Sequence, residues 1–168
     1  MKSFAQEKEP DFIGEAYLLN SENESVKLDK VIGELSSGMS FSSNSLNALS
    51  LEIQGEESQT RIPIGKPINL VVRAVDNNSD PLIIISTYKF KEKKKKRTVV
   101  LSKDNSGSLI KSRAPAKDMV KFSGQKYGNS SYLITLSNLE EGEYGIIVSN
   151  PNVKDEKRAV VSCFAIDK

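Results

Sequence analysis

The sequence contains no histidine, no tryptophan and a single cysteine, Cys163. Without histidine it lacks the side chain that most often serves as a general base near neutral pH and as a metal ligand. A Ser-His-Asp triad is therefore excluded, and no motif indicates the rarer Ser-Lys chemistry. One cysteine cannot form an intramolecular disulfide, so cysteine usage indicates no particular redox compartment. These absences argue against an enzyme, and we assign no catalytic, cofactor-binding or metal-binding residue.

Long apolar runs and a strong net charge are also missing. No run approaches the roughly 20 apolar residues that a membrane-spanning helix requires, so no transmembrane segment is expected. With 24 Lys and Arg against 22 Asp and Glu, the net charge is +2. A balance this close to zero creates no global field that would attract nucleic acid or an anionic membrane. Nucleic acid is therefore not an expected partner, and any basic patch must be local.

The first residues point to export. Ser3-Phe4-Ala5-Gln6 resembles the end of a secretory signal peptide, with small residues three positions and one position before a cleavage point after Ala5. The apolar region that precedes such a point is missing. We expect residues 1–10 to be a tail left by an export signal, and the protein to be periplasmic, at the cell surface or extracellular. An ordinary disordered N-terminus is the alternative explanation.

Apolar and polar residues alternate over short runs throughout the chain, which is typical of half-buried β-strands. The expected strands are residues 12–19, 26–32, 49–53, 60–64, 68–75, 82–90, 98–101, 132–136, 142–149 and 157–166. Pro63 restricts its strand to an edge or a bulge. Residues 82–85 are apolar on both faces, which indicates a central strand or one covered by the N-terminal hairpin. Residues 107–111 are a further candidate for a short strand, and residues 115–125 are expected to be irregular.

The chain is long enough to bury one sizeable core without disulfides. Residues 12–32 predict a hairpin, and because an isolated hairpin is marginal in water, we expect it to pack on the main sheet. Residues 36–47 are rich in Ser and Asn, which suits a crossing connection. The expected organisation is therefore a tail (1–10), a hairpin with its Ser-rich connection (11–47) and a β-domain (48–168).

A distinctive turn lies between the last two expected hairpin strands. Its residues Leu139, Gly142 and Tyr144, within LEEGEY, resemble the tyrosine corner of immunoglobulin-like and fibronectin-like domains, where a Tyr hydroxyl bonds back to nearby backbone. We expect the Tyr144 ring to be buried beneath this turn, with its hydroxyl bonded to the backbone of residues 137–142. The fold that this resemblance implies is an all-β, immunoglobulin-like antiparallel β-sandwich with an extra N-terminal hairpin.

The order of segments from residue 48 to residue 168 resembles uncharacterised exported bacterial proteins with an immunoglobulin-like fold. The likeness rests on Lys126-Tyr127-Gly128 and on Ser131-Tyr132, which precede the tyrosine corner. Such families carry no agreed function. The paired cysteines and core tryptophan of antibody domains are missing, so the resemblance implies no receptor-like role.

One dense block of basic side chains stands out. It consists of Lys91, Lys93, Lys94, Lys95, Lys96 and Arg97, which join two expected strands. Such a block is able to meet phosphate, sulfate or an acidic surface, but no aromatic residues are interleaved to stack on bases. A solvated hairpin end that keeps apolar strands soluble is the alternative explanation.

Two other groups of residues have structural explanations. Cys163 lies in an apolar run, where a thiol behaves as a small hydrophobic group, so we expect it to be buried. Asp76 and Asp80 flank Asn and Ser in a segment whose composition suits a tight turn better than a calcium site.

These observations predict a non-catalytic binding or structural module of the bacterial cell envelope or exterior. Its expected partner is an unknown protein or glycan, and the expected state is a monomer or weak oligomer. Two alternatives stay open. One is a carboxylate-based hydrolase acting on glycans, which needs two carboxylates across a cleft. The other is a binder of anionic polymers through the lysine-rich segment 91–97.

Overall fold

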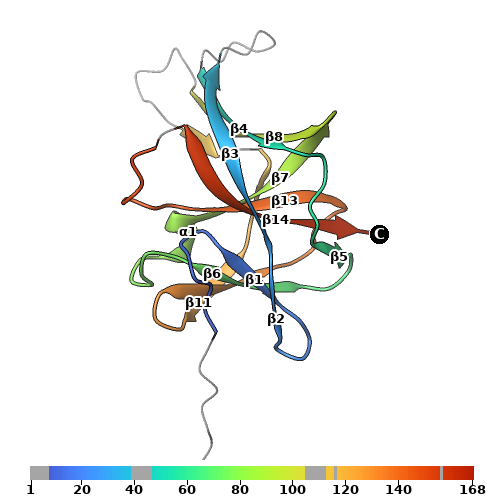
Figure 1. Ribbon diagram of the computed structural model, residues 1–168, viewed down its shortest axis with the longest axis vertical. Helices are drawn as coiled ribbons and strands as arrows, with labels where there is room; N and C mark the ends of the chain where they lie inside the picture. The colour runs from blue at the N-terminus through green and yellow to red at the C-terminus, as the bar shows by residue number, and fades with distance from the viewer. Residues whose placement is uncertain (1–7, 39–46, 105–112, 116, 156) are drawn as a thin grey trace, which may run out of the picture.

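A computed structural model describes residues 8–38, 47–104, 113–115, 117–155 and 157–168. These residues form two β layers (Figure 1). The first layer, sheet A, is antiparallel and contains, in spatial order, β11 (Ser123–Tyr127), β12 (Ser131–Leu136), β6 (Ile68–Arg73), β1 (Ala16–Leu19) and β2 (Ser25–Lys27). Among the described residues, no helix has the length and apolar character needed to cross a membrane.

The second layer, sheet B, closes on itself. Its spatial order is β10 (Met119–Val120), β7 (Ile85–Lys93), β13 (Gly142–Val148), β14 (Arg158–Asp167), β3 (Asp29–Gly38), β4 (Asn47–Gln54), β8 (Lys96–Asp104) and β9 (Arg113–Pro115). The short β5 (Arg61–Pro63) pairs in parallel with the end of β14. Because β7 also pairs with β8, the strands from β7 through β8 form a closed six-stranded barrel.

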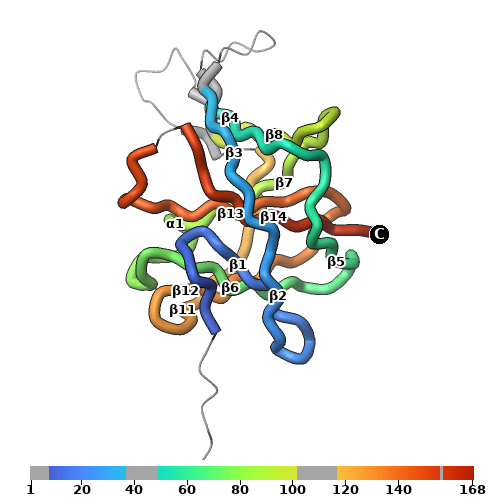
Figure 2. Tube along the Cα trace, viewed as in Figure 1, coloured from blue at the N-terminus to red at the C-terminus, as the bar shows by residue number. Residues whose placement is uncertain are grey.

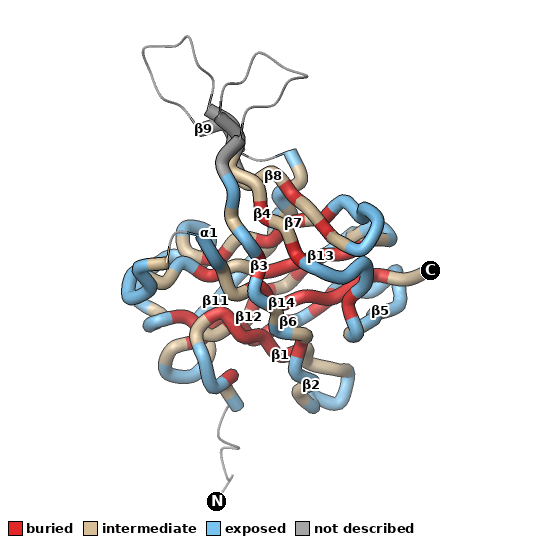
Figure 3. Tube along the Cα trace, turned by 45° about the horizontal axis from the view of Figure 1, so that its top comes forward, coloured by how far each residue is buried: buried red, intermediate tan, exposed pale blue. Residues whose placement is uncertain are grey.

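β13 and β14 belong to both parts of the hydrophobic core, because alternate side chains of a strand point to opposite faces. Tyr144, Ile146 and Phe164 face sheet A and pack with its apolar residues. Val161 and Cys163 face the barrel interior, where they contact a second apolar cluster. Figure 3 shows β13 and β14 as largely buried segments in the middle of the molecule. This hairpin therefore supports both layers.

The tyrosine corner has the expected geometry. The Tyr144 ring is buried and its hydroxyl donates to the Glu140 carbonyl oxygen over 2.8 Å, which confirms the predicted hydrogen bond. Gly142 has a φ of +148°, a conformation that L side chains rarely adopt, and a Cβ there would meet the Lys89 side chain at 2.8 Å. Leu139 packs against the core between the layers. The turn is thus fixed by one hydrogen bond, one glycine and one apolar anchor.

The all-β class expected from the sequence is confirmed, although sheet B is closed rather than open. The N-terminal hairpin is formed by β1 and β2, and β1 pairs with β6 of sheet A. The chain then passes to the other layer, where β3 lies between β14 and β4. The segment expected to cover the main domain therefore contributes strands to both of its layers.

The prediction of a strand over residues 82–90 is wrong for residues 82–84. Pro81–Ile84 form a helical turn, α1, because Asp80 caps the Leu82 N–H at 2.9 Å and Pro81 fits the first helical turn. The strand β7 begins only at Ile85. The apolar side chains of Leu82 and Ile83 are consequently exposed rather than paired in a sheet.

Three further expectations about the strands differ from the structure. Phe12 to Glu15 do not belong to a strand, since β1 begins at Ala16. The segment 115–125, expected to be irregular, contains β10 and most of β11. The connection expected at 36–47 is shorter than predicted, because β3 extends to Gly38 and β4 begins at Asn47. The candidate strand 107–111 and the tail residues 1–7 lie outside the described residues.

Candidate functional site

The hairpin of β13 and β14 separates at one end. The two strands pair from Gly142 to Ile146 on β13 and from Ser162 to Ile166 on β14. Beyond this ladder β13 continues along β7, with Val148 opposite Ile85, while β14 continues along β3. Figure 2 shows the strands diverging, with residues 149–155 leading away from the end of β13. A seam therefore opens between two neighbouring strands of the barrel.

A pocket of about 370 Å³ lies in this seam, at the lower end of the size range of ligand pockets (about 300–1,000 Å³). Its lining is mostly aliphatic and includes Ile13, Ile32, Ile147, Val148, Val153 and Val160. Asn150, Asp155 and Arg158 add polar groups. An apolar cavity with few polar groups is the usual composition of a binding site.

The N-terminal segment forms one wall of the pocket through Ile13 and Gly14. Gly14 has a φ of +89°, and a Cβ there would approach Val160 Cγ1 to 3.2 Å. Glycine therefore permits both the turn and the close approach to β14. The Ser162 hydroxyl donates to the Gly14 carbonyl oxygen at 2.6 Å, and the Gly14 N–H donates to the Arg73 carbonyl oxygen at 3.0 Å.

Glu15 fixes the same segment by charge. Its side chain is 1% exposed, and its Oε1 lies 2.6 Å from Lys30 Nζ and 2.9 Å from Lys27 Nζ. The Phe12 N–H donates to Oε2 over 3.2 Å. Burial alone would raise the pKa of Glu15, but the hydrogen bonds from Lys30, Lys27 and Phe12 lower the pKa to about 2. The wall of the pocket is therefore held by a carboxylate that stays ionised at ordinary pH.

Apolar side chains are exposed around the pocket. Ile32 and Val153, which line it, are 55% and 54% exposed, and Phe12, next to Ile13, is 65% exposed. The exposed helical turn α1 is joined to the pocket loop, because the Ser149 N–H donates to the Ile84 carbonyl oxygen. Clustered apolar exposure of this kind marks interaction sites more often than scattered single residues do.

Arg158 and Asp155 form the charged part of the rim. Arg158 Nε donates to Asp155 Oδ2 over 2.6 Å, and the Lys157 N–H donates to Oδ1 over 2.9 Å. The Arg158 guanidinium is the main reason that the pKa of Asp155 lies below its usual range. The Arg158 side chain is 67% exposed, so its remaining donors face solvent. The rim thus offers cationic groups beside an apolar cavity.

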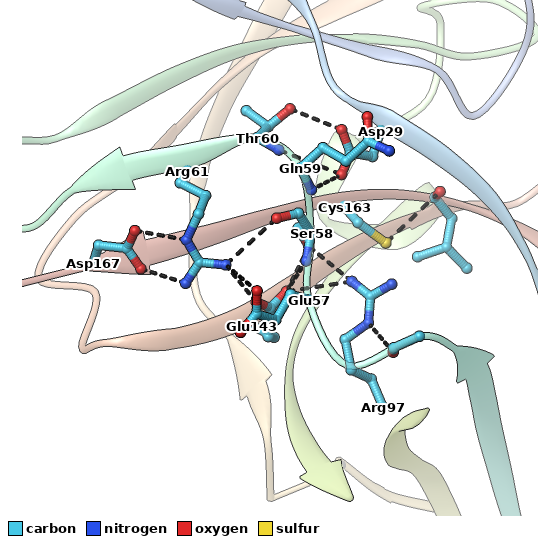
Figure 4. A network of polar contacts seen from close by, with 12 residues as sticks. Asp29, Glu57, Ser58, Gln59, Thr60, Arg61, Arg97, Glu143, Cys163 and Asp167 are labelled. Atoms are coloured by element: carbon cyan, nitrogen blue, oxygen red, sulfur yellow. Dashed lines mark hydrogen bonds and ion pairs between the residues drawn. The ribbon is translucent and has the colours of Figure 1, made fainter. Parts of the chain in front are cut away.

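The paired end of the same hairpin contains a network of buried polar groups (Figure 4). Glu143 Oε2 accepts from the Ser58 hydroxyl at 2.5 Å and from Arg97 Nη1 at 3.3 Å. Its other oxygen accepts from Arg61 Nη1, and Arg61 forms a two-pronged pair with Asp167. The Glu143 and Arg97 side chains are 1% and 4% exposed. Their hydrogen-bonding capacity is engaged inside the protein, as buried charges require.

Two more contacts tie this network to the barrel. Asp29 of β3 accepts from Thr60 Oγ1 at 3.0 Å and also from the Gln59 N–H, so the segment before β5 is held to β3. Cys163 lies beside the network and is fully buried, as the sequence predicted. Burial raises the pKa of its thiol to about 12, so the thiolate is not populated at neutral pH. These groups stabilise the barrel end.

The structure divides the basic block of the sequence. Lys91 and Lys93 end β7, Lys94 and Lys95 form the turn, and Lys96 begins β8 and pairs with Glu52 at 2.6 Å. The first four of these lysines are exposed. Arg97 instead points into the barrel and belongs to the buried network. The hairpin tip thus brings the lysines together and leaves Arg97 out.

Sequence reasoning did not find the seam pocket. Its aliphatic lining residues come from the N-terminal segment, β3, β13, β14 and the 149–157 loop, so they form no local motif. One signal was present, because the 149–157 connection is longer than the roughly 2–5 residues of most hairpin loops. Within the described part of the chain, no group of three or more Cys, Asp or Glu side chains is placed to hold a metal ion.

In comparisons with known proteins, no protein-family model, no curated protein and no solved structure matches the chain.

Proposed function

We propose that this protein is a non-catalytic binding module, and that it holds its ligand in the pocket between the separated ends of β13 and β14. The observation that carries the proposal is the pocket itself, an aliphatic cavity of about 370 Å³ whose lining includes the exposed side chains of Ile32 and Val153. Apolar surface left in contact with water is costly, at about 25 cal/mol per Å², so its burial by a partner stabilises a complex.

The proposed setting is the bacterial cell envelope or exterior, where an unknown protein or glycan is the partner and the module is a monomer or weak oligomer. Support comes from the sequence around Ala5, which resembles a signal-peptide end. Within the all-β class, we propose that the fold is an immunoglobulin-like sandwich. It is supported by the Tyr144 corner and by the packing of sheet A on the β13–β14 hairpin.

One alternative function has an observation in its favour. Lys91, Lys93, Lys94 and Lys95 are exposed together at the tip of the β7–β8 hairpin, which suits contact with an anionic polymer. The glycan-hydrolase alternative has less support. Its mechanism needs two carboxylates across a cleft, and Asp155 is the one acidic residue among the described residues that line the pocket.

The pocket is tested with 8-anilinonaphthalene-1-sulfonate, a dye that fluoresces in apolar sites. We expect saturable binding by the native protein, with amide chemical-shift changes at the pocket residues. Val153→Asp places a charge on the rim and should weaken dye binding at least about tenfold, because an apolar contact is replaced by a carboxylate.

The matched control is Val26→Asp on β2, because Val26 is exposed to a similar degree and does not line the pocket. This variant should bind the dye as the native protein does. Equal binding by both variants, or no saturable binding by the native protein, would show that the pocket is not a binding site.

A further inference from the structure

We infer that the ligand of the seam pocket is an extended peptide that adds to the free edge of β14 as an extra strand and places an aliphatic side chain in the pocket. This inference rests on the proposed function and specifies the class of partner. In strand addition, main-chain hydrogen bonds give affinity, and pockets for alternate side chains give specificity.

The register of β14 shows which backbone groups face the seam. Lys157 lies opposite Leu35 of β3, since the Leu35 N–H donates to the Lys157 carbonyl oxygen over 2.7 Å. In an antiparallel ladder, alternate residues direct their N–H and C=O groups to the same neighbour. Ala159 and Val161 therefore also face β3. Arg158 and Val160 direct their backbone groups the other way, toward β13.

The opposite wall of the seam is similar. The Ser149 N–H donates to the Ile84 carbonyl oxygen, so Ser149 and, two residues earlier, Ile147 face β7. Val148 therefore directs its backbone groups toward β14. If the strands had stayed together, Val148 would pair with Val160, but the ladder ends one step earlier at Ile146 and Ser162.

The backbone groups of Val148 and Val160 have no strand partner among the described residues, whereas the Arg158 N–H bonds to the Asp155 carboxylate. An N–H or C=O group beside an apolar cavity is costly to leave without a partner, and an open strand edge is a template for pairing. An aliphatic small molecule would fill the pocket but would give no hydrogen bond to Val148 or Val160. A peptide supplies both the side chain and the backbone groups, so it matches the whole seam.

The charged side chains beside the seam indicate which peptide residues should be preferred. The side chains of Lys157 and Arg158 are exposed beside the seam, and Asp155 accepts from the Lys157 backbone N–H and from the Arg158 guanidinium. An acidic residue next to the aliphatic one would lie near these cations. The chemistry of the seam therefore fits an extended segment in which aliphatic and acidic residues are neighbours.

The test uses the peptide acetyl-Glu-Val-Thr-Val-Glu-amide and two analogues, one N-methylated at both valines and the other N-methylated at threonine. Adjacent residues of a strand direct their N–H groups to opposite sides, so only one analogue loses the donors that face β14. We expect the analogue that lacks the donors facing β14 to bind at least about tenfold more weakly than the unmethylated peptide, as measured by titration calorimetry.

Hydrogen exchange gives a readout that side-chain binding alone would not change. In the complex with the unmethylated peptide, the Val160 amide should exchange at least about tenfold more slowly. The amide of Val161 is the internal control, since it faces β3 and pairs with Val31 whether or not the peptide is bound. Its exchange should stay the same.

The outcomes separate the two proposals. If the dye binds in the pocket but the peptide does not, if both analogues bind as tightly as the unmethylated peptide, or if Val160 exchange is unchanged, strand addition is wrong and the binding pocket stands. If neither dye nor peptide binds, both proposals are wrong. A tenfold loss of affinity on N-methylation together with slower exchange at Val160 supports strand addition.

Discussion

The two ends of the β13–β14 hairpin differ in the groups that they place in the protein interior. At the paired end, the charged groups inside the barrel are bonded to one another, with Glu143 accepting from Ser58, Arg97 and Arg61. At the separated end, the interior is aliphatic, and the backbone groups of Val148 and Val160 face a pocket. One end is closed by its own polar groups, and the other is left open.

The difference indicates where a partner is able to bind. A polar network whose donors and acceptors are all engaged offers little to a ligand, because the ligand would have to break existing bonds. A seam with apolar walls and free strand edges gains both burial and hydrogen bonds when it is filled. The buried charged residues thus stabilise the fold, whereas the aliphatic residues that line the pocket provide the candidate binding site.

The largest expected effect comes from breaking the closed end. Glu143→Ala leaves the Arg97 charge buried without its carboxylate partner, so the free energy of unfolding should fall by about 3–5 kcal/mol. Asp155→Ala at the open end is the control, and it should cost far less because its partner Arg158 is exposed. Urea denaturation measures both. Similar losses in the two variants would contradict the contrast between the ends.

The next largest effect is expected on acidification, which should weaken the contacts of Glu15 that hold the pocket wall. The folded-state pKa of Glu15 is about 2, below its ordinary value of 4.5, so its stabilisation is complete above about pH 4.5 and is lost as the pH falls toward 2. The contribution should be roughly 3 kcal/mol. Denaturation curves of the native protein and of Glu15→Gln, recorded from pH 6 to pH 2, should therefore converge at low pH.

A constant difference between these two proteins across that range would show that Glu15 is not the titrating anchor. Glu140→Gln is a useful comparison, because the Lys89 side chain lowers the pKa of Glu140 in an exposed pair. The stability difference between this variant and the native protein should depend on pH less than the Glu15→Gln difference does.

A smaller effect is expected at the turn that precedes the paired end. Tyr144→Phe removes the hydroxyl that donates to the Glu140 carbonyl oxygen, so it should cost about 1–3 kcal/mol. Ligand binding in the seam should be unchanged, because Tyr144 faces sheet A and does not line the pocket. Thermal unfolding at the same midpoint as the native protein would show that this hydrogen bond does not stabilise the corner.

The smallest effect on stability is expected at the lysine hairpin. Replacing Lys93, Lys94, Lys95 and Lys96 by Ser should change the free energy of unfolding by less than about 1 kcal/mol, because the single described ion pair of this group, Lys96 with Glu52, is at the surface. If the tip binds anionic polymers, the variant should elute from heparin at lower salt. Unchanged retention on heparin would remove that alternative function.

The features that could be predicted from the sequence are those that depend on residues close together in the chain. The alternation in residues 132–136 and 142–149 is enough to place β12 and β13, and the Tyr144 hydrogen bond follows from a six-residue turn. The burial of Cys163 was likewise predictable from the apolar run around it. The helical turn α1 was missed although its signal, Asp80 followed by Pro81, was present, because the apolar run after it favoured a strand.

The closed barrel and the seam depend on contacts that no local pattern encodes. The buried Arg97 looked like one more member of a basic block, and only its pairing with Glu143, on a distant strand, distinguishes it from the exposed lysines. The pocket likewise requires that Ile13, Ile32 and Val160 come together from segments far apart in the chain. Register and closure are tertiary properties, and side-chain alternation alone does not specify which strands meet.

The pairing of β3 with β14 has a consequence for biosynthesis. Val31 leaves the ribosome well before its partner Val161, which lies much later in the chain. At about 5–20 residues per second, synthesis of the intervening chain takes on the order of ten seconds, during which that edge of β3 waits without its neighbour. Contacts so distant in sequence also fold slowly. The nascent chain should therefore depend on being kept from premature association until β14 has been made.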